Sequence, residues 1–288
     1  MTRLSARTSL FLILCAPPLE AQKSSGPQRG TLIVDGGGAI SDVRKKFVEL
    51  AGGANARIIV IPTGPSAIRF GEQNTILDPD APRDAPEWRA YTAYIKEWLG
   101  IDSVVFMHTR DRAIASSDTF GRPLKDATGV YLTPGNSGRY AAAYLGTRTQ
   151  QELAALLQRG GVIFGSSAGA IIQGSFTVRG RADKPLLMAA GHTTGFGFMK
   201  NVAVNPHLTS AQRDAELVNV VDAHPEILGI GIDDDAALIV KGNAFEVIGK
   251  GRVAIYDNVR RDGAWYYWLG AGGRFDLATW TRIAATVP

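Results

Sequence analysis

The stretch that decides the fold runs from Gly161 to Gly174 and reads GVIFGSSAGAIIQG. An apolar run over 162–164 stops at Gly-Ser-Ser-Ala-Gly, and small apolar residues resume directly after it. This order predicts a buried strand, a tight turn and a helix. The turn matches G-x-S-x-G with Ser167 at its centre, the pattern that lifts a nucleophilic serine above the end of a strand. The same pattern also occurs in plain turns, so the chemistry depends on partners elsewhere in the chain.

Apolar segments alternate with helical ones on both sides of this stretch. Strands are expected over four earlier segments, 30–38, 56–64, 102–109 and 127–135. Near-continuous apolar strands between helices are typical of a parallel sheet covered on both faces. The sequence therefore predicts an α/β fold, a three-layer α/β/α sandwich with a mainly parallel sheet. Residues 64–86 are interpreted as a long loop, a helix is expected from Ser210, and 229–257 predict a C-terminal β-meander.

The first 21 residues have the order of a secretory signal peptide. MTRLSAR carries two arginines and no acid, TSLFLILCAPPL is a short apolar core, and Ala21 provides a small residue before a cut. Residues 22–29 form a polar linker, and residues 30–288 are expected to form a single domain. The mature protein is therefore predicted to be secreted or periplasmic.

Composition bounds the partners and the chemistry. The net charge of +4 is mild and no Lys/Arg block stands out, so no nucleic-acid partner is expected. No apolar run reaches about 18 residues, so no membrane span is expected. The only cysteine, Cys15, lies in the expected signal peptide. Covalent catalysis in the mature chain would therefore have to use a serine, a threonine or another group.

A nucleophilic serine needs a base, and the chain has four histidines. His207 follows the apolar segment VAV through Asn205 and Pro206 and is the best placed for a base carried on a loop. The other three close a strand, lie in a Gly- and Thr-rich loop and end an amphipathic helix; they are His108, His192 and His224.

A third group should orient the imidazole, and two acidic segments are candidates. Asp233, Asp234 and Asp235 follow a short apolar segment, whereas Asp183 lies between the serine and the histidine in the chain. The triple acid also fits a solvated turn or a cation site. Side chains alternate along a strand, so three consecutive acids cannot all face one ion. A single orienting acid is therefore favoured over a metal site.

The loop over 134–139, PGNSGR, ends the fourth strand and opens a helix. Backbone amides in such a loop can stabilise an oxyanion or bind a carboxylate. No metal or organic cofactor is expected, because the P-loop, H-E-x-x-H and EF-hand patterns are absent from the sequence. The loop over 35–38, DGGG, lacks the spacing of a dinucleotide site.

Four segments taken together resemble a known family. GSSAGA, the PGN before it, the NPHL after it and GIGIDDDAAL are similar to cyanophycinases and to the related aspartyl dipeptidases of the peptidase E type. The resemblance runs from about Gly30 to Asp257. Members are serine exopeptidases on a fold like that of class I glutamine amidotransferases. It implies that residues 30–288 are one peptidase domain, which acts on a peptide substrate without a cofactor, and it is compatible with a homodimer.

The resemblance also implies roles for individual residues. Ser167 would be the nucleophile, His207 the base and Asp234 the third member, at a place where the family often has glutamate. Asp183 stays a second candidate, since a family acid has been proposed in that region. The amides of Gly135 and Ala168 would hold the oxyanion.

Substrate binding is expected from four polar side chains, Asn136, Ser137, Asn205 and Arg213. Cyanophycinases usually have aspartate at the position of Asn205, and only Arg213 remains of several arginines in the following helix. The substrate is expected to be a cyanophycin-like β-Asp-Arg peptide or another Asp-containing peptide, cleaved through an acyl-enzyme.

Two other classes of function also use or keep these features. A serine esterase of the α/β-hydrolase type has the same elbow, but its chain order is serine, acid, histidine. With Asp234 as the acid, the order here is serine, histidine, acid. The second alternative is a non-catalytic binding protein that kept the fold.

Overall fold

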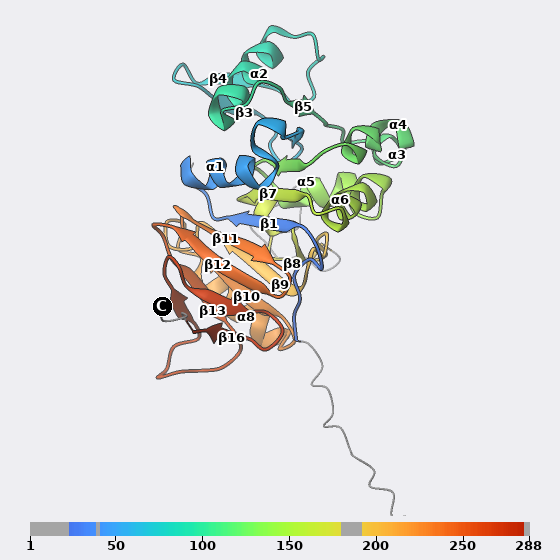
Figure 1. Cartoon of the computed structure of the whole chain (residues 1–288). Coiled ribbons are helices and arrows are strands. Elements are labelled where there is room, and N and C mark those ends of the chain that lie inside the picture. The colour runs from blue at the N-terminus through green and yellow to red at the C-terminus, as the bar shows by residue number, and fades with distance from the viewer. Residues whose placement is uncertain (1–22, 39–40, 180–191, 285–288) are drawn as a thin grey trace, which may run out of the picture.

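The computed structural model describes residues 23–38, 41–179 and 192–284. The predicted signal peptide, 1–21, lies outside the described residues. A nine-stranded sheet forms the centre of the molecule (Figure 1). Its strands, in order across the sheet, are β16 (Thr281–Ile283), β15 (Arg274–Asp276), β12 (Ala244–Gly249), β11 (Ala236–Lys241), β1 (Thr31–Asp35), β7 (Val162–Ser166), β6 (Gly129–Leu132), β2 (Ile58–Ile61) and β5 (Val105–Phe106).

The expected parallel strands form one half of this sheet. β1, β7, β6, β2 and β5 run parallel to one another, while β1 pairs antiparallel with β11 on its other side. Alternation along β1 sends Leu32 and Val34 to one face and Ile33 to the opposite face. The next residue on the face of Ile33 is Asp35, where β1 ends beside Ser166 of β7.

A second sheet of five strands packs on one face of the first. Its order is β14 (Tyr267–Leu269), β13 (Val253–Tyr256), β10 (Leu228–Ile232), β9 (Met199–Pro206) and β8 (Gly174–Thr177). Buried residues of β9 and β10 share one hydrophobic core with Leu32 and Val34. The segment predicted as a single meander is therefore divided: β10 and β13 join the second sheet, and β11 and β12 join the first.

Helices cover the remaining faces. α1 (Ser41–Leu50) and α2 (Pro86–Leu99) pack on the face of Ile33, and α5 (Ser137–Tyr144), α6 (Arg148–Gln158) and α7 (Ala168–Ile171) pack on the opposite face. α8 (Asp214–Ala223) covers the outer face of the second sheet. The short helices α3 (Arg112–Ala115) and α4 (Asp118–Gly121) lie near α5 and α6 (Figure 1). The predicted α/β/α sandwich is confirmed.

Two local predictions differ from the structure. The expected loop over 64–86 contains a hairpin, β3 (Ile68–Phe70) and β4 (Thr75–Leu77), whose Phe70 and Leu77 are buried against α2. The helix expected from Ser210 begins at Asp214, because the chain turns first and Gln212 has a φ of 55°.

Candidate active site

Ser167 occupies a strained turn between β7 and α7. Its φ of 52° and ψ of −109° lie in a sparsely populated region, which costs on the order of 1–3 kcal/mol. A Cβ on Gly165 would lie 2.1 Å from the carbonyl oxygen of Gly169, so the turn has no room for a larger residue there. The amide of Ser167 donates to the carbonyl of Asp35 at 3.0 Å, which fixes the elbow to the end of β1.

His207 follows the end of β9 and reaches the elbow from the second sheet. Its Nε2 lies 2.9 Å from Oγ of Ser167. The backbone of His207 has a φ of 56°, and its amide donates to the carbonyl of Gly36. A Cβ on Gly37 would lie 2.3 Å from Cε1 of His207, so this glycine is what lets the imidazole pack against the loop after β1.

Asp234 lies in the turn that leads from β10 to β11. Its Oδ1 is 2.5 Å from Nδ1 of His207. Partial burial by itself raises the pKa of Asp234, but hydrogen bonds from Ser210 and His207 outweigh it, so the pKa lies below its ordinary value. The carboxylate is therefore ionised at neutral pH and accepts a hydrogen bond from the ring. Ser167, His207 and Asp234 thus form one continuous hydrogen-bonded chain.

The other two acids of the triplet, Asp233 and Asp235, are not hydrogen-bonded to His207. Asp233 is buried, and its carboxylate accepts hydrogen bonds from the amide and the hydroxyl of Thr209 at 3.1 and 2.5 Å. Asp235 is exposed and has a φ of 60°. Asp183 lies outside the described residues. In the part of the chain that the structure describes, no three His, Cys, Asp or Glu side chains are grouped to hold a metal ion.

Two backbone amides that the resemblance links to the oxyanion are without a backbone carbonyl partner in the described chain. They belong to Gly135, at the end of the loop after β6, and Ala168, the first residue of α7. A Cβ on Gly135 would lie 2.2 Å from the carbonyl carbon of Gly64, and its φ is 140°. Glycine is therefore required for this loop to approach Gly64. Gly135, Ser167 and His207 line the same cavity.

The polar side chains after Gly135 hold their own loop. Oδ1 of Asn136 accepts from the amide of Gly138 at 2.8 Å and caps α5. The hydroxyl of Ser137 is buried and donates to the carbonyl of Arg179 at 2.7 Å. Contact of either side chain with a substrate stays a prediction.

The remaining two predicted binding residues, Asn205 and Arg213, make hydrogen bonds within the protein near His207. Asn205 is fully buried, and its Nδ2 donates to Glu216 at 2.9 Å. Glu216 also pairs with Arg179. Arg213 is half-buried and donates to the carbonyl of Pro206 at 3.0 Å. Their contact with a substrate also stays a prediction.

The remaining histidines are not part of the hydrogen-bonded chain of Ser167, His207 and Asp234. His108 is bonded to Thr63 at 2.9 Å and to Asp80 at 2.8 Å, so both of its ring nitrogens are engaged. His192 is exposed and His224 is half-buried. Of the described histidines, His207 alone is hydrogen-bonded to Ser167.

The helices among the described residues include none with the length and apolar composition of a membrane span.

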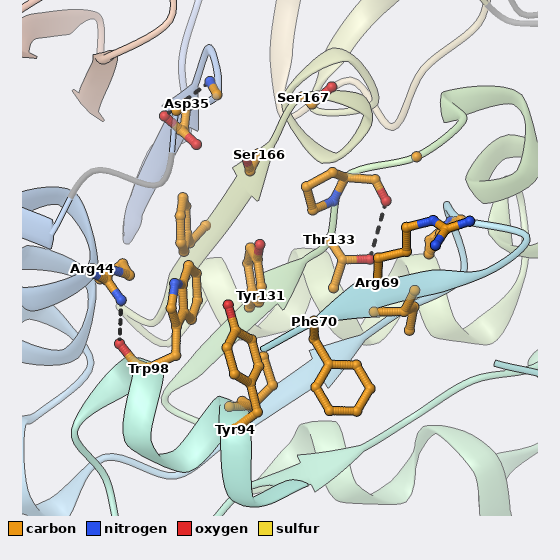
Figure 2. A pocket seen from close by; sticks show the side chains of 18 of the residues that line it. Asp35, Arg44, Arg69, Phe70, Tyr94, Trp98, Tyr131, Thr133, Ser166 and Ser167 are labelled. Atoms are coloured by element: carbon orange, nitrogen blue, oxygen red, sulfur yellow. Dashed lines mark hydrogen bonds between the residues drawn. The ribbon is translucent and has the colours of Figure 1, made fainter. Parts of the chain in front are cut away.

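A cavity of about 440 Å³ opens beside the elbow. Figure 2 shows it from close by, with Asp35, Ser166 and Ser167 at one end and the rings of Tyr94 and Trp98 at the other. Asp35 was not singled out from the sequence. An acid that closes the otherwise apolar strand TLIVD is the signal that could have drawn attention to it.

Asp35 is 3% exposed. Burial, helped by the nearby charges of Asp234 and Asp235, outweighs the hydrogen bonds from the Ser166 hydroxyl and the Gly37 amide and raises the pKa of its carboxyl to about 7. The Gly37 amide lies 3.2 Å from Oδ1. A titratable carboxyl therefore lies next to Ser166, the residue that precedes Ser167.

Comparison with known proteins gives consistent matches. The sequence model of peptidase family S51 matches residues 32–248. A cyanophycinase from Synechococcus elongatus is 30% identical over 235 residues, which cover 78% of this chain and 68% of the relative. A cyanophycinase from Geminocystis herdmanii is 27% identical over 220 residues and 75% of each chain.

Solved structures share the fold at lower identity. A peptidase from an acI-B1 Actinobacterium superposes with a TM-score of 0.64 at 23% identity, covering 87% of this chain and 98% of the other. A putative peptidase E protein from Listeria monocytogenes EGD-e gives a TM-score of 0.50 at 16% identity, covering 77% and 98%. These two likenesses concern the fold alone.

Proposed function

Because the chain belongs to peptidase family S51, and is therefore a serine-type peptidase, we propose that Ser167, His207 and Asp234 carry out its catalysis. One observation carries this proposal: the unbroken hydrogen-bonded chain from Oγ of Ser167 through the imidazole to the Asp234 carboxylate. A serine hydroxyl is a weak nucleophile until a base takes its proton, and this chain supplies both the base and its orienting acid.

The proposed reaction is acyl transfer in two steps. Nε2 of His207 accepts the Ser167 proton as Oγ attacks the scissile carbonyl carbon. The imidazolium then gives this proton to the leaving amine, and the acyl group stays on Oγ. Water attacks the acyl-enzyme with His207 again as base, which releases the acid product and restores the serine. The ionised Asp234 stabilises the imidazolium in both steps.

The carbonyl oxygen that becomes negative needs donors. The amides of Gly135 and Ala168 are the donors we propose, because neither is used by another backbone carbonyl in the described chain. The order of the proposed triad, serine, histidine, acid, differs from the serine, acid, histidine order of α/β-hydrolases. This difference supports a peptidase over an esterase.

A serine-directed fluorophosphonate tests the nucleophile. We expect covalent labelling of the native protein and of Ser166→Ala, and none of Ser167→Ala, because only Oγ of Ser167 is bonded to the base. Circular dichroism of each variant controls for folding. Labelling of Ser167→Ala, or no labelling of the native protein, would contradict the mechanism.

For the substrate, we propose peptides with aspartate next to the scissile bond, including β-Asp-Arg peptides of the cyanophycin type. Two relatives are cyanophycinases, and Arg213 is a cation near Asp234 that suits an acidic side chain. Mass spectrometry of products from β-Asp-Arg polymer, isoaspartyl dipeptides and Asp-X dipeptides tests this. Cleavage of none of the three would refute it.

We also propose that the protein acts after export, as a secreted or periplasmic enzyme, on the basis of the signal-peptide pattern over 1–21. N-terminal sequencing of the protein purified from its native host should give a chain that starts near Gln22. A chain that keeps Met1 or Thr2 would refute this proposal.

A further inference from the structure

The floor of the cavity beside Ser167 is built by three neighbouring parallel strands. Alternation sends Asp35 of β1, Ser166 of β7 and Tyr131 of β6 to the same face of the sheet, and all three line the cavity. In Figure 2 the Tyr131 ring stands below Ser166, with its hydroxyl toward the end where Asp35 lies. The polar end of the cavity is therefore rich in oxygen acceptors.

Aromatic rings form most of the remaining walls. They come from α2, from the β3–β4 hairpin and from β6 and β7, and they are Phe70, Tyr91, Tyr94, Trp98, Tyr131 and Phe164. Tyr91 and Tyr94 are stacked with centroids 6.3 Å apart, and Tyr131 stacks on Phe164 at 4.7 Å. The electron-rich faces of such rings attract cations, most strongly where water is excluded.

Asp35 has no cation of its own in this part of the molecule. Among the described residues, the groups that donate to its carboxyl are the Gly37 amide and the Ser166 hydroxyl, and no ion pair involves it. A carboxylate has about four acceptor positions, so two remain for a ligand. A buried acid without a counter-ion is costly, and a cationic ligand would remove that cost.

Other charged groups face the cavity from several elements. Arg44 of α1 is engaged with Trp98, since its Nη1 donates to the Trp98 carbonyl at 2.9 Å and its guanidinium lies over the Trp98 ring. Arg69 of the hairpin is exposed. On the elbow side the neighbouring groups are His207, Asp234 and Asp235, and both acids add negative potential at Asp35. The end of the cavity at Asp35 is therefore acidic, and the two arginines lie on other walls.

We propose that this cavity binds a basic side chain of the peptide substrate, with its cationic group beside Asp35 and its methylene stem on the aromatic rings. The inference rests on the proposed function for the identity of the ligand as a peptide. It assigns Asp35 as a specificity-determining residue, distinct from the catalytic triad. A cation there keeps the carboxyl ionised and has its own charge neutralised at the buried end of the cavity.

Binding to catalytically inactive protein tests the inference without any turnover. The probes are the dipeptides β-Asp-Arg and β-Asp-citrulline, because citrulline keeps the size of arginine and lacks its charge. Titration calorimetry of Ser167→Ala is expected to give an affinity for the arginine probe higher by about tenfold or more. Adding Asp35→Asn should reduce this preference to below about twofold. The exposed Asp42→Asn is the matched control, expected to keep the full preference.

A second variant tests the aromatic wall without touching the acid. Tyr94 is half-buried, and Tyr94→Leu is expected to weaken the arginine probe more than the citrulline probe. Equal affinities of the two probes for Ser167→Ala would overturn the inference. So would tighter binding of β-Asp-Phe than of β-Asp-Arg, or a preference that survives Asp35→Asn.

The test also separates this inference from the proposed function. Phosphonate labelling of Ser167 without any preference for arginine would refute the cavity's role and leave the peptidase mechanism standing. A charge preference that depends on Asp35 in a protein that does not react with the phosphonate would do the reverse.

Discussion

Asp35→Asn should change how the stability of the protein depends on pH. In the folded chain the pKa of Asp35 is about 7, whereas its ordinary value is 3.8. Below pH 3.8 the carboxyl is protonated in both the folded and the unfolded chain, and its burial adds no charge penalty. As the pH rises from 3.8 to about 7, the unfolded chain ionises first, so the folded state loses stability through this window.

The size of the effect follows from the difference of about 3 in pKa. A difference of one in pKa corresponds to about 1.4 kcal/mol of unfolding free energy. The native chain therefore loses on the order of 4 kcal/mol between pH 4 and pH 8 through this group. Asparagine keeps the shape of the side chain and carries no charge. The variant should therefore have about the native stability at pH 4 and exceed it by up to about 4 kcal/mol at pH 8.

Urea unfolding of the native protein, Asp35→Asn and the exposed control Asp42→Asn at several pH values between 4 and 8 measures this directly. The difference between the native and Asp35→Asn unfolding free energies is the relevant quantity, since other titrating groups cancel in it. Parallel stability curves for these two proteins over the whole range would refute the assigned burial and pKa of Asp35.

Three further predictions concern turnover. Asp234→Asn should lower kcat far more than Asp183→Asn, because the Asp234 carboxylate is bonded to Nδ1 of His207; the reverse order would move the orienting role to Asp183. Gly37→Ala should lower kcat by on the order of 10²-fold through displacement of the imidazole, and native kcat in a folded variant would contradict the packing. Arg213→Ala should raise KM for substrates with an acidic residue, with Arg213→Lys closer to native; an unchanged KM would remove Arg213 from the binding site.

The catalytic candidates could be predicted because their signals are local. The glycines that the turn at Ser167 requires lie within the same five-residue motif as the serine. His207 follows a short apolar strand that is visible in the sequence pattern. The parallel half of the sheet was predictable for the same reason. The choice of Asp234 over its neighbours came from resemblance, since sequence spacing does not decide which of three adjacent acids faces a ring.

The cavity could not be predicted because it depends on contacts between distant segments. Its aromatic rings come from β6 and β7, from α2, and from a hairpin in the segment 64–86, whose prolines favour a loop. The hydrogen bond that engages Ser137 is also non-local, since it runs to Arg179, 42 residues further along the chain. Sequence patterns detect an element more readily than the partner that it will bind.

The acid, the imidazole and the serine are delivered by different sheets, and this has a consequence for the life of the molecule. Ser167 follows a strand of the nine-stranded sheet, His207 follows a strand of the five-stranded sheet, and Asp234 joins one sheet to the other. A newly made or partly unfolded chain in which the sheets have not docked has a serine without a base. Hydrolytic activity should therefore appear only once the two sheets have docked, and not when either sheet alone has formed.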